Sequence, residues 1–434
     1  MFKNFINAFK VKEIRNKILL TILLVLIYRL GCWIPVPGVD ATAFASQVSG
    51  DEGFLGLLSS VSGGALANGS LLALGIAPYI SASIIIQLLT IAVPSLERLS
   101  KMGDEGRKKI AGYTKIAALV LAIAQAVAIV ISFEGVLKES TLGDGLTLPT
   151  WFVGIVVTLV LIAGSMFTYW LGEKITELGI SNGQSILIFV GILSTAGTSL
   201  LTNFTNIFNG DMGSLTELLL FILALILIFG FIVWIDGSER KVPVQYAKQI
   251  KGRKMYGGQS TFIPIRVNAT GVMPIIFAMS LLSFPQLILS IFVDTTTNKF
   301  YLWYSKWLGA GSWVYIILVG LLITFFAYFW TQVTFNPDDV SKNIQQNGGF
   351  IPGIRPGKPT SDYLKKISNR VTLFGALFLS VIAIIPSLIF KSIGGSLVGA
   401  FSATGLLIVV SVAIEFDKSL EAQMLMKSYK GFLK

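Results

Sequence analysis

Histidine, the side chain that most often supplies acid–base and metal chemistry near neutral pH, is absent from this chain. The chain has a single cysteine, Cys32, so it forms no internal disulfide and no metal site built from several cysteines. The lack of histidine also excludes a Ser-His-Asp triad and a His-Glu-x-x-His zinc motif. We therefore predict no catalytic residue, no metal site and no cofactor.

The acidic residues avoid the centres of the long apolar segments. Glu217 lies at the start of one such segment, and Arg29 lies within another. An Asp or Glu at mid-depth usually marks an ion or proton pathway, so its absence argues against a proton- or sodium-coupled transporter. For Arg29 we expect snorkelling towards the membrane surface or packing against a neighbouring helix.

The basic residues concentrate in two long polar stretches, 236–268 and 333–369. The first stretch carries seven of them: Arg240, Lys241, Lys248, Lys251, Arg253, Lys254 and Arg266. Its alternating runs 242–246 and 261–267 flank Gly257-Gly258, which predicts a short β-hairpin arm with Pro at its edges. Pro and Gly punctuate the second stretch from 350 to 360, which predicts a stiff exposed loop.

Two interpretations of these basic stretches stay open on the residues alone. Basic loops beside a membrane usually fix the orientation of the protein in that membrane and contact lipid headgroups. Both stretches are longer than that purpose needs, and Tyr246, Tyr256 and Phe262 accompany the cations of the first. Such a surface would suit nucleic acid or an acidic protein partner.

The elements that must position these residues are apolar helices. The 434 residues are 53% hydrophobic and 13% charged, and the mean hydropathy is +0.75. A soluble protein would carry about twice that share of charge. Apolar blocks of about 20 residues are long enough to cross a bilayer as helices. We predict ten spans: 18–34, 72–93, 116–133, 151–171, 184–203, 215–235, 270–292, 311–332, 371–390 and 397–414.

Lys and Arg are divided unequally between the two sides of these spans. With the N-terminus inside, 29 of them lie on the inner side and Arg29 lies within a span. The outer side holds four: Lys138, Lys299, Lys306 and Lys391. Because positive residues are retained in the cytoplasm, both termini are predicted to be cytoplasmic, which agrees with an even number of spans.

Two spans begin with the same interruption. A Gly-x-x-Pro motif occupies 75–78 and 271–274, and an isoleucine follows each proline two residues later, at Ile80 and Ile276. Matching breaks in two parts of a chain indicate an internal repeat with a working site between the halves. The apolar, Gly- and Ser-rich segment 54–68 is too short to span. It is either an interfacial helix or a re-entrant segment in a cavity.

Several runs of the chain resemble the SecY family, whose members form the central subunit of the Sec protein-conducting channel. The similar runs are 75–89 (GIAPYISASIIIQLL), 96–99 (LERL), 106–110 (GRKKI), 242–247 (VPVQYA), 255–260 (MYGGQS), 352–357 (PGIRPG) and 429–434 (YKGFLK). They are collinear and cover nearly the whole chain. The chain departs from commoner family patterns at three places. Phe262 replaces a frequent His, and Lys358-Pro359 stands where an acidic-polar pair is often found. Ser181 stands where the family usually has the first Gly of a Gly-Asn-Gly run.

The resemblance implies one channel domain over residues 1–434, an all-α polytopic membrane protein of ten transmembrane helices. Two inverted five-helix halves, 1–205 and 206–434, would form a clamshell around a central pore. The ring that closes the pore would consist of Ile80, Ile84, Ile188, Ile192, Ile276 and Ile408. Stiff apolar side chains in such a ring exclude ions by dewetting and offer a passing polypeptide nothing to bind.

The resemblance also assigns a plug and a lateral gate. Residues at about 54–68 would be the plug, with Leu57, Leu58, Val61, Gly63, Gly64 and Leu66 as its candidate residues. Spans 2 and 7 would flank a gate with spans 3 and 8, where transmembrane segments pass into lipid. The candidate gate residues are Ser83, Gln87, Gln125 and Pro274.

The stretches 236–268 and 333–369 would be cytoplasmic docking loops for the SecA ATPase and for the ribosome with its rRNA. The docking candidates are Arg240, Lys251, Arg253, Lys254 and Arg355. Further partners that the resemblance implies are SecE, SecG, secretory preproteins with signal sequences, membrane lipids and a second copy of the complex. The implied location is the bacterial plasma membrane.

The expected function is that of a passive protein-conducting channel and not of an enzyme. It would pass unfolded secretory polypeptides across the membrane and release transmembrane segments sideways, driven by SecA or the ribosome. A small-solute transporter shares the inverted-repeat logic, but we would expect a carboxylate in the middle of one of its spans. A membrane enzyme would need an intramembrane carboxylate pair, and no span places one at mid-depth.

Overall fold

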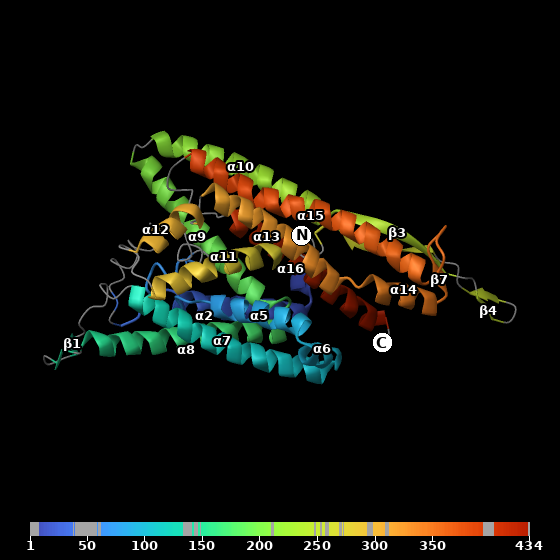
Figure 1. The fold of residues 1–434 in the computed structure, drawn as a ribbon, viewed down its shortest axis with the longest axis horizontal. Coiled ribbons are helices and arrows are strands. Elements are labelled where there is room, and N and C mark those ends of the chain that lie inside the picture. Colours follow the sequence, from blue (N-terminus) through green and yellow to red (C-terminus); the bar gives the residue numbers. More distant parts are fainter. Residues whose placement is uncertain are drawn as a thin grey trace. The chain divides into compact units, whose positions relative to one another are not determined.

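The computed structural model describes most of the chain (Figure 1). The described residues are 8–37, 39, 59, 62–132, 141–142, 146–147, 149–209, 212–246, 249–251, 254–256, 260–268, 271, 273–292, 298–308, 312–393 and 403–432. The chain divides into two compact units, and each is described here by itself. Unit 1 comprises Met1–Leu215, Ser280–Tyr315 and Gly394–Lys434, and unit 2 comprises Thr216–Met279 and Ile316–Ile393.

Unit 1 is built from packed helices. They are α2 (Lys12–Gly31), α5 (Ala77–Ala92), α6 (Pro94–Lys101), α7 (Asp104–Ser132), α8 (Thr150–Leu178), α9 (Gly183–Phe208), α12 (Lys299–Leu308) and α16 (Ala403–Phe432). Helix α7 packs between α5 and α8, while α9 contacts α2, α8 and α16. A two-stranded sheet pairs β1 (Thr141–Leu142) with β2 (Leu146–Thr147). One apolar core joins Leu66 and Leu74 to α7 and α8, and a second joins Ile14 and Ile18 of α2 to Leu420 of α16.

Unit 2 combines helices with a small antiparallel sheet. Its helices are most of α10 (Met212–Asp236) and α13 (Trp313–Thr334), the first part of α11 (Met273–Phe292), α14 (Pro337–Gln346) and α15 (Lys358–Ile393). Its strands are β3 (Glu239–Tyr246), β4 (Gln249–Lys251), β5 (Lys254–Tyr256), β6 (Ser260–Arg266) and β7 (Gly349–Phe350). The sheet order is β6-β3-β7. Helices α10 and α15 run side by side (Figure 1), and the rings of Phe231 and Phe378 meet between them at 5.5 Å.

Each of the ten predicted spans overlaps one helix of the structure, namely α2, α5, α7, α8, α9, α10, α11, α13, α15 and α16. Among the described residues, six helices are long and apolar enough to cross a membrane, or seven if α5 and α6 count as one bent span. The bend between α5 and α6 is 101°. It falls at Val93, because Pro94 cannot continue the hydrogen-bond ladder of α5.

Both predicted helix breaks are confirmed. Gly75 and Gly271 adopt left-handed backbone with φ of +54° and +60°, a conformation that costs glycine little. Helix α5 begins two residues after Gly75, and α11 begins two residues after Gly271. Each proline then stands in a first helical turn, where its missing N–H removes no hydrogen bond. The internal repeat itself stays a prediction.

The predicted hairpin arm is also confirmed, whereas the predicted loop needs a correction. Strand β3 pairs with β6 from Glu239↔Arg266 to Gln245↔Ser260. Strand β4 pairs with β5 from Gln249↔Tyr256 to Lys251↔Lys254, so the chain reverses between 251 and 254 and not, as predicted, at Gly257-Gly258. The predicted loop at 350–360 is confirmed over 351–357, which lies outside helices and strands, but Ile351 is buried and α15 already begins at Lys358. The rest of 333–369 is largely α14 and the start of α15. Pro359 fits the first turn of α15 for the same reason as Pro78 fits that of α5.

Candidate functional site

The segment 62–75 is an irregular, buried stretch that packs within unit 1 between α2, α8 and α9. Ser62, Ala65, Leu66 and Ser70 are almost fully buried. The Ser62 hydroxyl accepts from the amide of Leu66 at 3.3 Å and so holds a local turn. The described part of the predicted plug is therefore buried and irregular, which favours the re-entrant alternative over an exposed interfacial helix. Leu57, Leu58 and Val61 lie outside the described residues.

Two adjacent residues of α2 donate hydrogen bonds to two adjacent carbonyls of this segment. The Tyr28 hydroxyl donates to the Ser62 carbonyl, and Nη1 of Arg29 donates to the Gly63 carbonyl, each at 3.3 Å. Nη2 of the same guanidinium donates to the Ser194 hydroxyl on α9. Arg29 therefore links α2, the segment and α9, so the expected packing role is confirmed and its partners are now identified.

Glycine at position 63 is required by space and by backbone conformation. Its φ of +70° is left-handed, and an added Cβ would stand 2.7 Å from Cα of Gly191 on α9. Gly64 also has a left-handed φ, +79°, but a Cβ there would meet nothing within 4 Å. Gly63 therefore marks the close contact with α9, while Gly64 only turns the chain.

The later part of the segment is fixed to the start of α5 and to α8. The amide of Leu71 donates to the Ile34 carbonyl at 2.9 Å. The Ser165 hydroxyl of α8 donates to the Gly75 carbonyl at 3.1 Å. Gly164 lies beside the same stretch, since a Cβ there would be 1.9 Å from the Leu71 carbonyl oxygen. Small residues on α8 thus let two backbones meet, as is typical of membrane-helix packing.

The six isoleucines predicted for the pore ring lie on four helices. Ile80 and Ile84 are on α5, Ile188 and Ile192 on α9, Ile276 on α11 and Ile408 on α16. Ile84, Ile188, Ile192 and Ile408 are buried, with exposures of 8%, 7%, 3% and 6%. Ile80 and Ile276 are half-buried. Ile276 belongs to unit 2 and the other five to unit 1.

The predicted gate residues are polar groups in mostly apolar surroundings. Nε2 of Gln87 donates to the Ser83 hydroxyl one turn earlier on α5, at 3.3 Å. Gln125 on α7 is 3% exposed. Within the part of the chain that the structure describes, the Oε1 atoms of Gln87 and Gln125 have no hydrogen-bond partner. Pro274 is buried in the first turn of α11.

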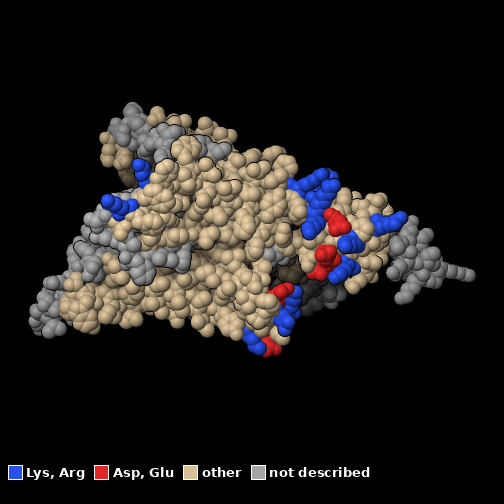
Figure 2. Space-filling view, in the orientation of Figure 1, with Lys and Arg blue, Asp and Glu red and all other residues tan. Residues whose placement is uncertain are grey.

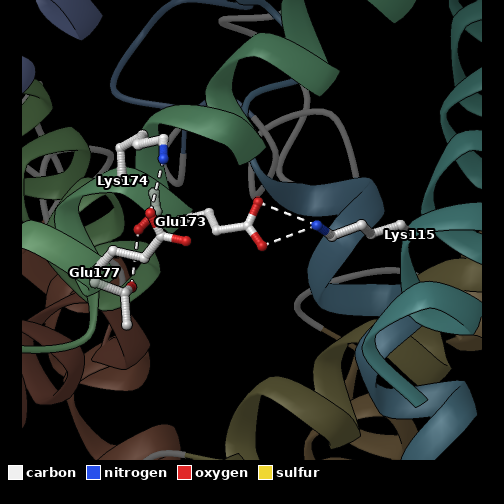
Figure 3. A network of polar contacts seen from close by, with 6 residues as sticks. Lys115, Glu173, Lys174 and Glu177 are labelled. Carbon is white, nitrogen blue, oxygen red and sulfur yellow. Dashed lines mark hydrogen bonds and ion pairs between the residues drawn. The ribbon is translucent and has the colours of Figure 1, made fainter. Parts of the chain in front are cut away.

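An ion pair joins α7 and α8 (Figure 3), and two aromatic rings connect it to α5. Nζ of Lys115 on α7 lies 2.9 and 3.2 Å from the two carboxylate oxygens of Glu173 on α8. The same Nζ lies 5.5 Å from the ring centre of Tyr169, and that ring contacts Tyr79 of α5 at 4.5 Å. Sequence reasoning missed this cluster. The opposite charges at the ends of two neighbouring spans were the signal that could have found it.

The two polar stretches form one folded module in unit 2. Gly349 and Phe350 of β7 pair with Tyr246 and Gln245 of β3, so the second stretch adds a strand to the hairpin of the first. A core holds the module together: Val242, Val244, Ile265, Ile344, Ile351 and Leu364. Figure 2 shows Lys, Arg, Asp and Glu gathered over the part of the surface that carries β3, β7 and α14.

The basic docking candidates lie on this module. Arg240 and Arg355 are exposed. Lys251 is on β4 and Lys254 is on β5, whereas Arg253 lies outside the described residues. Nζ of Lys241 lies 4.7 Å from the ring centre of Phe262, which is 50% exposed. The result is an exposed cationic surface with an aromatic side chain in it, one that can attract phosphate or carboxylate groups.

The comparisons with known proteins agree with this architecture. The SecY family model matches residues 70–416. Protein translocase subunit SecY of Streptomyces coelicolor is 40% identical over 445 residues and covers 100% of both chains. The chain belongs to the SecY family. The SecY of Thermotoga maritima is 39% identical over 441 residues, with 100% of this chain and 98% of that protein covered.

Solved structures show the same fold for this SecY-family chain. "The structure of a protein conducting channel" matches with a TM-score of 0.64 and 21% identity, covering 93% of this chain and 91% of that one. The match to "Sec61 in the Canine ribosome-channel complex from the endoplasmic reticulum" has a TM-score of 0.63 and 20% identity, with the same coverage. The predicted family and fold class, a helical multi-pass membrane channel, are therefore confirmed.

The short helix α6 of this SecY-family chain carries a surface ion pair. Nζ of Lys101 lies 2.7 Å from Oε1 of Glu97, one turn earlier. The hydrogen bond and the charge of Lys101 lower the pKa of the exposed Glu97 carboxyl. Over the described ranges, Cys, Asp and Glu form no group of three or more that could hold a metal ion.

Proposed function

We propose that this chain is the passive, gated channel through which unfolded secretory polypeptides cross a bacterial plasma membrane. Full-length similarity to translocase subunits supports the proposal. The buried segment 62–75 supports the gating, because its described residues occupy a resting place among α2, α8 and α9. A neighbouring structure is titled "The plug domain of the SecY protein stablizes the closed state of the translocation channel and maintains a membrane seal". We assign the same task to this segment.

The pore constriction in this proposal is the isoleucine ring. Four of its six members are almost fully buried, which suits side chains that close a path at rest. A polypeptide would move past them without forming hydrogen bonds, whereas an ion would have to lose its hydration shell. Ser83, Gln87, Gln125 and Pro274 would line the lateral gate, where partly unsatisfied amides such as those of Gln87 and Gln125 can exchange partners as helices part.

The driving energy would come from partners at the basic module. Related channels have been solved as a ribosome-channel complex and as an idle complex "bound to the yeast 80S ribosome". Arg240, Lys251, Arg253, Lys254 and Arg355 would contact ribosomal RNA or the SecA motor. SecE and SecG would complete the complex, and a second copy could join it. Preproteins with signal sequences and membrane lipids would be the ligands of the pore and the gate. The two termini would lie in the cytoplasm.

A crosslinking experiment tests the polypeptide path. A photo-crosslinking amino acid replaces Ile276 or Ile84 in the complex with SecE, and a secretory chain bearing a folded domain is stalled during SecA-driven transport. We expect crosslinks that require ATP and a functional signal sequence. Leu227 on α10, which is 66% exposed, provides a control position that should give none. Secretion that proceeds without crosslinks from Ile276 and Ile84 would show that the ring is misplaced.

A further inference from the structure

We propose that Arg29 is the positioning residue that holds residues 62–64 of the plug in their resting place, by bridging the backbone of Gly63 to Ser194 on α9. The inference rests on the proposed function, which makes this segment the plug. It goes further because it assigns the resting position to one side chain of another helix. It also predicts which bonds must break first when the segment leaves.

The position of Arg29 suits a bridge rather than a snorkelling side chain. Arg29 lies in the last turn of α2 and is half-buried. Its Nη1 donates to the Gly63 carbonyl at 3.3 Å, and its Nη2 donates to the Ser194 hydroxyl. The planar guanidinium presents several donors in a fixed geometry, so one group can bind two acceptors on different elements at once.

Electrostatics favours the resting position. In the portion of the chain that is described, no carboxylate lies within ion-pair distance of Arg29. Its charge is compensated there by a carbonyl and a hydroxyl. A cation in apolar surroundings is costly unless hydrogen bonds surround it. Moving the plug away removes one of these two acceptors, so the charge itself opposes opening.

The contact is shaped for a backbone and not for a side chain. A Cβ at Gly63 would stand 2.5 Å from Nη1 of Arg29 and 2.7 Å from Cα of Gly191. The neighbouring carbonyl of Ser62 accepts from the Tyr28 hydroxyl at 3.3 Å. Consecutive donors on α2 therefore bind consecutive carbonyls of the plug, which fixes its register along the helix.

Cys32 provides a built-in reporter of this contact. It is the only cysteine of the chain, it is fully buried, and its Sγ lies 4.0 Å from the Ser62 carbonyl oxygen. If the plug moves, a thiol reagent should reach Cys32 without any engineered cysteine. The rate of labelling thus measures plug position independently of transport.

The test compares Arg29→Met with Arg15→Met in the complete complex, reconstituted in vesicles without preprotein. Arg15 is an exposed cation on the same helix and has no part in the plug contact. We expect Arg29→Met to accelerate maleimide labelling of Cys32 by roughly tenfold, the effect of losing one charge-assisted hydrogen bond. Arg15→Met should label at the original rate. Ion permeability of the vesicles should rise with the labelling rate.

Ser194→Ala provides a second variant that keeps the charge and removes only the α9 acceptor. It should give a smaller acceleration, and Arg29→Lys should fall between Met and the original residue. Unchanged labelling in Arg29→Met, or in Ser194→Ala if the former does not assemble, would overturn the proposal. Faster labelling of Cys32 without crosslinks from the isoleucine ring would support the role of Arg29 and reject the proposed polypeptide path. The failure of one proposal can therefore be distinguished from the failure of the other.

Discussion

Helix α8 comes so close to segment 62–75 at Gly164 that an alanine there should displace the segment. An added Cβ would lie 1.9 Å from the Leu71 carbonyl oxygen and 3.0 Å from its carbon. A carbon–oxygen contact is comfortable only beyond roughly 3.3 Å, so the backbones must separate by about 1.4 Å. Both atoms that collide belong to backbone or to Cβ, so no side-chain rotation can relieve the contact.

The cost follows from what this separation breaks. The hydroxyl of Ser165, the next residue on α8, donates to the Gly75 carbonyl at 3.1 Å, and such a shift carries the pair out of hydrogen-bond range. Losing a buried hydrogen bond costs about 1–3 kcal/mol. Forcing an extra carbon into a packed site costs about 1–3 kcal/mol more. We therefore expect Gly164→Ala to destabilise unit 1 by roughly 2–6 kcal/mol, the sum of these two contributions.

Thermal unfolding of the purified complex, followed by the reaction of Cys32 with a fluorogenic thiol reagent, measures this cost. We expect the midpoint to fall by roughly 3–10 °C for a unit of this size. Gly197→Ala on α9 is the matched control, because a Cβ there meets nothing within 4 Å. That variant should not lower the midpoint, since alanine favours helix over glycine. An unchanged midpoint for Gly164→Ala would show that α8 does not touch the backbone of Leu71.

Three further perturbations address the ring and the basic module. Replacing Ile84, Ile188 and Ile408 together by Gly should raise the ion conductance of the resting channel in planar bilayers, because a wider constriction stays wet, and unchanged conductance would refute their assignment. Leu364→Ala removes a fully buried side chain from the module core, which should cost about 2–5 kcal/mol and speed proteolysis within 236–268, whereas unaltered cleavage would contradict that core. Arg355→Ala should weaken ribosome or SecA binding and flatten its salt dependence, and identical salt slopes would exclude Arg355 as a contact.

The helical part of the fold could be predicted because its causes are local. Apolar blocks of bilayer length gave ten spans, and each overlaps a helix. Gly75 and Gly271 marked helix starts because the left-handed backbone that precedes each helix favours glycine. The hairpin arm was visible in the alternation of 242–246 and 261–267, whose inward residues Val242, Val244 and Ile265 do form a core.

What the sequence could not supply are contacts between distant residues. No periodicity links Arg29 to Gly63 and Ser194, although these contacts fix the segment. Lys115 and Glu173 carry opposite charges at the ends of neighbouring spans, but only the packing of α7 against α8 makes them a pair. The loop predicted at 350–360 is too long at its end, because α15 already begins at Lys358. Pro359 was taken as a helix breaker, but Pro is accepted in the first turn of a helix. Tertiary context decided each of these cases.

Segment 62–75, to whose first part we assign the role of the plug, combines two kinds of packing, and their order along the chain would let a seal open without unfolding. Residues after position 65 are anchored by side chains, since Leu66 and Leu74 are fully buried in the core with α7 and α8. Residues 62–64 are held instead through two carbonyls and a glycine contact, which can break without exposing a large apolar side chain. The free energy that holds the anchored part grows with buried apolar area, whereas that of the front part rests on a few directional bonds. A polypeptide that displaces residues 62–64 therefore needs to break only those bonds. The buried side chains of Leu66 and Leu74 would keep the segment close enough to return.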